Sequence, residues 1–172
     1  MSIHGNRTME NPKEIKECKM KGCIIKNNDI SIKEIFNCIE DIGKYNWLIT
    51  NIECYPSDEE IAGKMDVEYC WIEGTELLRL LNKEDFQWIW GVFSAFPKEV
   101  NLEKVLRYNY PYADGYKGFW ENTISVQHPL ATTEVVAWDG SFILVISRDN
   151  EIVNMVMKEN DFAKDLEEYN RE

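Results

Sequence analysis

The sequence predicts a single α+β domain, in which a mainly antiparallel sheet of about five or six strands has helices packed on one face. The first indication is the segment 131–149, where two runs rich in β-branched and aromatic residues flank Asp139-Gly140. Asp-Gly favours a two-residue hairpin turn, because both central positions of that turn need φ > 0. The second indication is the apolar run 86–96, which is typical of a central strand covered on both faces. We therefore expect the hairpin to lie in the middle of the sheet.

The chain of 172 residues is long enough for one domain with a sizeable core. Residues 1–17 are polar and lack periodicity, so we expect a flexible N-terminal arm before the domain at 18–172. The arm lacks the apolar core of a signal peptide, and no stretch approaches the roughly 20 apolar residues of a membrane span. Five cysteines without a C-x-x-C pair are typical of reduced thiols. These features predict a cytoplasmic protein.

Capping residues mark several expected helix starts. Ser31 and Glu34 match a capping box, in which each side chain bonds the backbone of the other at a helix start. Apolar residues follow at helical spacing as far as Gly43, which is a typical helix stop. Thr75 is a second capping residue, before a helix whose expected inner face carries Leu77, Leu78 and Leu81. The expected helices are 32–42, 75–81, a short one within 100–106, one that begins at Asp149 or Asn150, and one that Asp161 caps and that carries Phe162, Leu166 and Tyr169.

The remaining apolar runs predict strands, and the polar runs predict loops. Besides the hairpin, the expected strands are 18–26, 45–55, 67–72 and 86–96. Gly91 in the last of these indicates a bulge or a close backbone approach. The acidic segment 57–66 contains Gly63 and is expected to be a loop. Residues 109–120 combine proline, glycine and five aromatic residues with few aliphatic ones, so we expect the longest loop there.

Charge limits the classes of partner. The chain has 31 acidic and 19 basic residues, which gives a formal net charge of −12. Such a protein repels nucleic-acid phosphates and anionic membranes and attracts basic proteins. We therefore expect neither nucleic acid nor a membrane as a partner. The segment 53–73 is strongly acidic, with Lys64 as its only basic residue, and a solvated surface is the simplest interpretation of such a run.

No catalytic or metal-binding motif stands out, so we expect no enzyme, no metal and no cofactor. The consecutive carboxylates Asp58, Glu59 and Glu60 lack the alternating spacing of a calcium loop. His128 stands before Pro129, close to the aromatic segment 108–120. A general base there would need a partner that no motif supplies, so a structural role is the simpler interpretation.

The aromatic loop, residues 108–120, is the strongest candidate for a recognition surface. Tyr and Trp supply rigid, amphipathic contact area and dominate interface hot spots. The alternative is that the loop folds back and covers one face of the sheet. The expected partner-binding residues are the acids Asp58, Glu59, Glu60 and Asp66 and the loop residues Tyr110, Tyr112, Asp114, Tyr116 and Trp120.

Several segments appear in a familiar order: YNWLI and IECYP, then WGVFSAFP, then HPLATTEVVAWDGSFILVIS, and finally DLEEYN. Together they resemble a group of poorly characterised small bacterial cytosolic proteins, some of which look like immunity proteins (antitoxins) of polymorphic or contact-dependent toxin systems. The resemblance implies a protein that binds a cognate toxin, often a basic nuclease domain, and blocks its active cleft. It supplies no catalytic residues. The acidic charge agrees with such a partner, because opposite charge steers association.

Two other classes of function stay open at this point. One is a small-molecule-binding protein or enzyme, with a pocket under the aromatic loop. A ligand-sized cavity would then hold His128, with a carboxylate or thiol within hydrogen-bond reach. The other is a structural or oligomeric scaffold, which an exposed sheet edge that pairs between two copies would favour.

Overall fold

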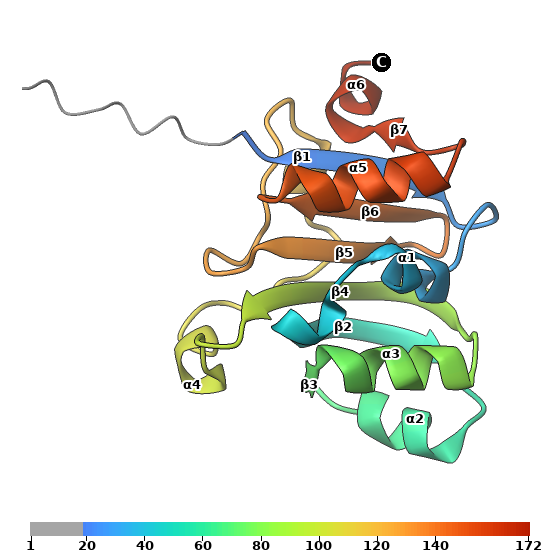
Figure 1. The fold of residues 1–172 in the computed structure, drawn as a ribbon, viewed down its shortest axis with the longest axis vertical. Coiled ribbons are helices and arrows are strands. Elements are labelled where there is room, and N and C mark those ends of the chain that lie inside the picture. Colours follow the sequence, from blue (N-terminus) through green and yellow to red (C-terminus); the bar gives the residue numbers. More distant parts are fainter. Residues whose placement is uncertain (1–18) are drawn as a thin grey trace, which may run out of the picture.

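A seven-stranded antiparallel sheet forms the centre of the computed structural model, which describes residues 19–172 (Figure 1). Its strand order is β3-β2-β4-β5-β6-β1-β7. The strands are β1 (Lys21–Lys26), β2 (Tyr45–Tyr55), β3 (Tyr69–Glu73), β4 (Gln87–Pro97), β5 (Thr133–Trp138), β6 (Phe142–Ser147) and β7 (Lys164–Asp165). The predicted α+β class is confirmed. The strand beyond the expected six is β7, whose two residues are too few for a periodic pattern. The expected arm at 1–17 lies outside the described residues.

The hairpin of β5 and β6 occupies the middle of this sheet, as its turn residues predict. Asp139 and Gly140 both adopt positive φ, 50° and 62°, which is the geometry that the Asp-Gly pair favours. The two strands pair in register from Thr133 with Ser147 to Trp138 with Phe142. β4 lies beside the hairpin and pairs with β2 on its other side. The apolar run 86–96 is therefore a central strand.

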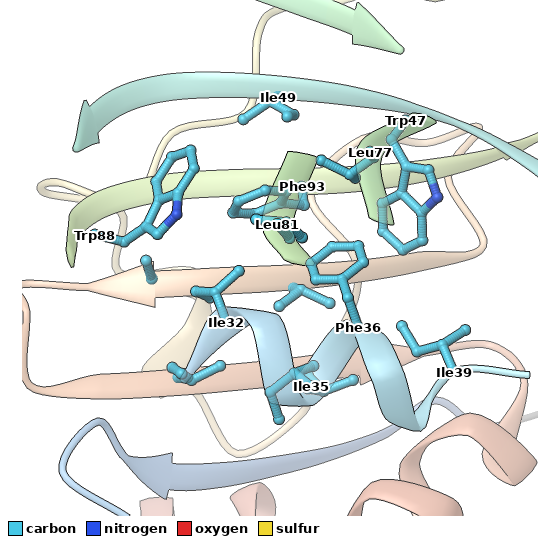
Figure 2. Close-up of a cluster of buried hydrophobic side chains, with 14 of the residues drawn as sticks. Ile32, Ile35, Phe36, Ile39, Trp47, Ile49, Leu77, Leu81, Trp88 and Phe93 are labelled. Carbon is cyan, nitrogen blue, oxygen red and sulfur yellow. The ribbon is translucent and has the colours of Figure 1, made fainter. Parts of the chain in front are cut away.

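Four helices cover one face of the sheet and enclose the larger core (Figures 1 and 2). Phe36 lies at the centre of this core, with its ring 4.8 Å from that of Trp47 and 5.1 Å from that of Phe93. The capping box of Ser31 and Glu34 is present at the start of the first helix. The helices are α1 (Ile32–Cys38), α2 (Glu59–Met65), α3 (Gly74–Lys83) and α5 (Asn150–Glu159).

The long connection between β4 and β5 covers the other face of the sheet, together with the C-terminal helix. A second core lies there, built on Phe96, Phe119, Leu144 and Leu166, all of them fully buried. The central strands are apolar on both faces because both faces are covered. The short elements on this side are α4 (Leu102–Val105), η2 (Gly118–Trp120) and α6 (Leu166–Arg171).

The expected loop at 57–66 is wrong, because this segment contains helix α2. Asp58 is its N-cap, and the Asp58 carboxylate accepts a hydrogen bond from the Ile61 N–H. Ile61 and Met65 stand four residues apart and are both buried against the sheet. Gly63 is exposed, so the helix tolerates it at a small cost in propensity. The acidic first turn also suits the positive end of the helix dipole.

Three other helix boundaries differ from the expected ones. The helix expected at 32–42 ends at Cys38, and a separate 3₁₀ turn, η1 (Ile42–Lys44), follows it. α3 begins one residue before Thr75, because Glu73 is its capping residue. The last helix begins at Leu166 with Asp165 as its cap, since the preceding residues pair with β1 as strand β7.

Candidate functional site

An irregularity in β2 organises the candidate site. β3 pairs with β2 only as far as Thr50, whereas β4 pairs with β2 as far as Tyr55. The β2–β4 register shifts after Thr50, so that Asn51 and Ile52 face the single residue Gly91. The irregularity expected at Gly91 is therefore confirmed, and the extra residue belongs to the partner strand. A Cβ atom at Gly91 would lie only 2.9 Å from the Trp88 ring, so the backbone approaches that ring closely.

Asn51 connects this irregularity to the aromatic loop. Its φ of 51° lies in the left-handed region, which asparagine tolerates better than most residues. The Asn51 Oδ1 accepts hydrogen bonds from the backbone N–H groups of Ala113, at 2.8 Å, and Asp114, at 3.0 Å. These two hydrogen bonds hold the tip of the loop against β2, although the two segments are far apart in the sequence.

The start of the loop is held against β3. The Tyr110 ring packs edge-on against Tyr69, with 5.6 Å between centroids. The Tyr112 backbone N–H donates to Gln127 Oε1 at 2.6 Å, while the Tyr112 side chain is 47% exposed. Tyr110, Tyr112 and Asp114 thus lie where β3 begins, close to the segment that connects α2 to β3.

A groove of about 400 Å³ lies between α2 and the part of β2 that extends beyond β3. Two carboxylates line it, Glu53 from β2 and Asp66 from the end of α2. The Tyr55 side chain is 61% exposed, and its hydroxyl donates to Glu53 at 3.2 Å. The complete lining is Ile52, Glu53, Cys54, Tyr55, Pro56, Ala62, Met65 and Asp66.

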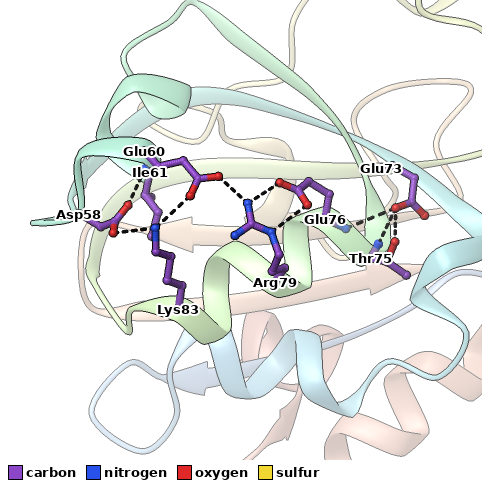
Figure 3. A network of polar contacts seen from close by, with 8 residues as sticks. All are labelled: Asp58, Glu60, Ile61, Glu73, Thr75, Glu76, Arg79 and Lys83. Carbon is purple, nitrogen blue, oxygen red and sulfur yellow. Dashed lines mark hydrogen bonds and ion pairs between the residues drawn. The ribbon is translucent and has the colours of Figure 1, made fainter.

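Two of the predicted acids, Asp58 and Glu60, are neutralised by α3 (Figure 3). Lys83 Nζ lies 2.9 Å from both carboxylates, and Arg79 bridges Glu60 to Glu76. The hydrogen bond from Lys83 lowers the pKa of Asp58, and the bonds from Arg79 and Lys83 lower the pKa of Glu60. This network joins α2 to α3, so its acids contribute to local structure and present little free charge to a partner.

Glu73 continues the same row of polar contacts at the start of α3 (Figure 3). Its carboxylate accepts from the Thr75 hydroxyl and from the backbone N–H groups of Thr75 and Glu76. These hydrogen bonds, with one from Lys98, lower the pKa of Glu73 to about 2. The carboxylate is therefore a helix cap that stays charged at every physiological pH.

Five other carboxylates, on β2, on α2 and the segment after it, and on the aromatic loop, are exposed and form no ion pair with any residue of 19–172. They are Glu53, Glu59, Asp66, Glu68 and Asp114. Glu59, Asp66 and Asp114 were predicted from the sequence as partner-binding residues, whereas Glu53 and Glu68 were not. Tyr55 was also not predicted. Glu53 and Tyr55 stand two residues apart on β2, so their side chains share a face, and this spacing is the sequence signal that could have identified both as surface residues.

The predicted loop residues separate into two groups. Tyr116 packs against Phe119, with ring centroids 4.6 Å apart, and Trp120 packs against Trp138 at 4.9 Å. Both side chains are only half-exposed and belong to the second core. The loop therefore covers the sheet with its second half and presents Tyr112 to solvent with its first half.

His128 has the contacts of a structural residue. Its ring is 1% exposed and packs between Phe96 and Tyr108. Nε2 donates to the Val105 carbonyl at 3.0 Å, and Nδ1 accepts from the Leu130 N–H at 3.1 Å. Burial lowers the pKa of His128, which favours this neutral form. Both ring nitrogens are thus engaged by backbone groups.

Comparison with known proteins identifies a family. A family model described as "Protein of unknown function (DUF2691)" matches residues 20–112 of the 172. This chain belongs to that family. No curated protein and no solved structure matches the chain.

The DUF2691 match covers β1 to β4 and ends at Tyr112. It therefore includes the irregularity at Asn51, the groove and the α2–α3 network, whereas the central hairpin and Trp120 lie beyond it. Within residues 19–172, no helix is long and apolar enough to cross a membrane. The same residues hold no group of three or more His, Cys, Asp or Glu side chains placed to bind a metal ion.

Proposed function

We propose that this protein is an acidic immunity-type inhibitor, which binds a basic toxin domain and blocks its active cleft. The observation that carries the proposal is the meeting of unpaired acids and exposed aromatic side chains at the end of β2. The acids come from β2, from α2 and the segment that follows it, and from the aromatic loop, which is far from the other segments in the sequence. We call this region the β2 surface; it comprises Glu53, Tyr55, Glu59, Asp66, Glu68, Tyr110, Tyr112 and Asp114.

The charge of the β2 surface supports a basic partner. Its five carboxylates have no ion-pair partner within 19–172, and the whole chain carries a net charge of −12. Neutral protein pairs associate at about 10⁵–10⁶ M⁻¹s⁻¹. Opposite charge on the two proteins raises this rate by roughly 10- to 10³-fold. A nuclease cleft that binds phosphates is basic, so an acidic surface is complementary to it.

The aromatic residues of the β2 surface support binding that is more than electrostatic. Tyr55 and Tyr112 are 61% and 47% exposed, although each ring could bury a large apolar area against a partner. Exposed tyrosines among carboxylates suit lysine and arginine side chains, which pair with the acids and pack over the rings. The alternative, a pocket around His128, has no comparable support because both of its ring nitrogens bond backbone groups.

The decisive experiment uses the product of the reading frame next to this gene in its own genome. We expect this product to arrest growth of a host cell, and co-expression of the chain to restore growth. The two purified proteins should form a complex whose association rate falls as salt rises. If the chain neither restores growth nor binds the neighbouring product, the inhibitor proposal is wrong.

The β2 surface is tested by charge reversal with a matched control. Glu53→Lys, Asp66→Lys and Glu68→Lys together should slow association at low salt by about tenfold or more. Glu121→Lys, Glu159→Lys and Asp161→Lys change the total charge equally, at exposed positions outside the surface. This control should retain most of the rate. Equal effects of the two triple variants would remove the β2 surface from the interface.

A further inference from the structure

We propose that the open edge of β2 at residues 52–55 binds an extended basic segment of the partner as an additional strand. The proposal rests on the proposed function, because it names the part of the partner that the β2 surface binds. It goes further than charge complementarity, since it assigns the contact to backbone hydrogen bonds along one short strand edge.

The strand pairing leaves this edge open. Thr50 is the last residue of β2 that pairs with β3, opposite Tyr69, the first residue of β3. After Thr50, β2 pairs with β4 alone. The neighbouring element is α2, whose backbone groups bond within the helix and cannot extend the ladder. An unpaired strand edge presents N–H and C=O groups that another chain can pair with.

The position of Asn51 explains why β3 does not continue along this edge. Its left-handed φ of 51° and the register shift after Thr50 turn β2 away from the line of β3. Pro56 then ends the strand. Between these two points lie residues 52–55 with no proline and no lysine, the residues that commonly protect strand edges.

The groove runs along this edge. Five consecutive residues, 52–56, line one of its sides. Successive side chains of a strand point to opposite faces, so a groove that touches all of them follows the edge and not one face. Four residues of strand span ~13 Å, which suits a segment of about four to six residues. The groove volume of about 400 Å³ lies in the range of peptide- and ligand-binding clefts.

The groove also determines the chemistry of the segment. Ala62 and Met65 of α2 form an apolar wall, and Glu53 and Asp66 place a carboxylate on each side. A strand with alternating apolar and basic residues would direct one set of side chains to the wall and the other to the carboxylates. A second copy of this chain is disfavoured, because its net charge of −12 would bring like charges together.

The test uses the full chain and three synthetic hexapeptides as probes. The first is Lys-Val-Lys-Val-Lys-Val, the second is Glu-Val-Glu-Val-Glu-Val, and the third repeats the first with its four central backbone nitrogens methylated. The methylated peptide keeps the charge and the side chains but cannot donate ladder hydrogen bonds. Binding is measured by NMR titration, and the amide hydrogen exchange of residues 52–55 is measured in the complex.

We expect the basic peptide to slow exchange at one or more amides of residues 52–55 by about tenfold or more. It should bind at least about tenfold more tightly than the acidic and the methylated peptides. Glu53→Gln with Asp66→Asn should weaken its binding several-fold without altering the fold, because both side chains are exposed.

Each contrary result has a distinct meaning. If the methylated peptide binds as tightly as the basic one, strand addition is wrong and only the charge of the surface matters. If the basic peptide protects amides elsewhere, or does not bind while the toxin does, the edge at 52–55 is not the site. If the edge binds the basic peptide but no toxin partner exists, strand addition stands and the inhibitor proposal fails.

Discussion

The carboxylate of Glu134, which is completely buried on β5, accepts a hydrogen bond from the backbone N–H of His128 at 2.8 Å. This contact anchors the end of the long connection to the middle of the sheet. The second carboxylate oxygen, Oε2, has no hydrogen-bond partner within residues 19–172. Burial raises the pKa of Glu134 to about 8, because the charged form loses its solvation.

Glu134 should therefore make stability depend on pH. Its folded pKa lies above the ordinary value of 4.5, so the folded state binds the proton more tightly than the unfolded state. The resulting stabilisation is fully present below pH 4.5 and is lost as the pH rises to about 8. Glu134→Gln should remove this dependence, and the free-energy difference between variant and wild type should change by roughly 2–4 kcal/mol from pH 4.5 to pH 8.

Urea unfolding of both proteins across this pH range measures the difference. Glutamine keeps an acceptor for the His128 N–H, so the comparison isolates the ionisation. Arg148 favours the charged form through its positive charge, while Tyr116 also lies close to the carboxyl group. Parallel pH profiles for wild type and Glu134→Gln would contradict the shifted pKa.

Asn51 should control the order of the aromatic loop. Asn51→Gly keeps the left-handed backbone accessible but removes the acceptor of the Ala113 and Asp114 N–H groups. We expect a loss of about 1–2 kcal/mol in stability. Amide exchange at residues 113 and 114 should become faster, as NMR can measure. Asn51→Asp retains an acceptor and a residue that tolerates this φ, so it should protect both amides; fast exchange in this variant would refute the role of the side chain.

Glu60 and Asp66 are both exposed acids, but substitution of Glu60 should affect stability, whereas substitution of Asp66 should affect toxin association. Glu60→Gln breaks the ion pairs with Arg79 and Lys83 and should lower stability only slightly, because the pairs are largely solvated. It should leave toxin association nearly unchanged. Asp66→Asn should slow association at low salt and leave stability unchanged. Stopped-flow association and thermal unfolding of both variants decide this, and a reversed pattern would place the interface on the α2–α3 network.

The turn of the central hairpin should depend on Gly140. Gly140 has a positive φ of 62°, which L side chains rarely adopt. A Cβ atom at this position would also lie only 3.2 Å from Ile89 Cδ1. Gly140→Ala should therefore lower the free energy of unfolding by about 1–2 kcal/mol. Asp139→Asn is the control, since asparagine is equally suited to this turn and should change stability little. Denaturant unfolding measures both variants, and an unaffected Gly140→Ala variant would show that the turn relaxes.

Local features of this protein were accessible from its sequence. The capping box of Ser31 and Glu34 and the turn at Asp139-Gly140 depend on residues within four positions of one another, so short patterns predict them. The same holds for the apolar run of β4, which indicated a central strand. The helix α2 could have been found as well, from the Asp58 cap and the spacing of Ile61 and Met65, but its acidic composition and Gly63 favoured a loop.

The candidate site was decided by tertiary structure. No local pattern places Asn51 against Ala113, or pairs Glu60 with Arg79, because these contacts join segments that meet only after the strands have taken the order β3-β2-β4. The antiparallel α+β class and an acidic surface with aromatic residues follow from local patterns in the sequence. The tertiary structure determined which acids stay unpaired and where β2 keeps an open edge, since both depend on which side chains and strands become neighbours across the sheet.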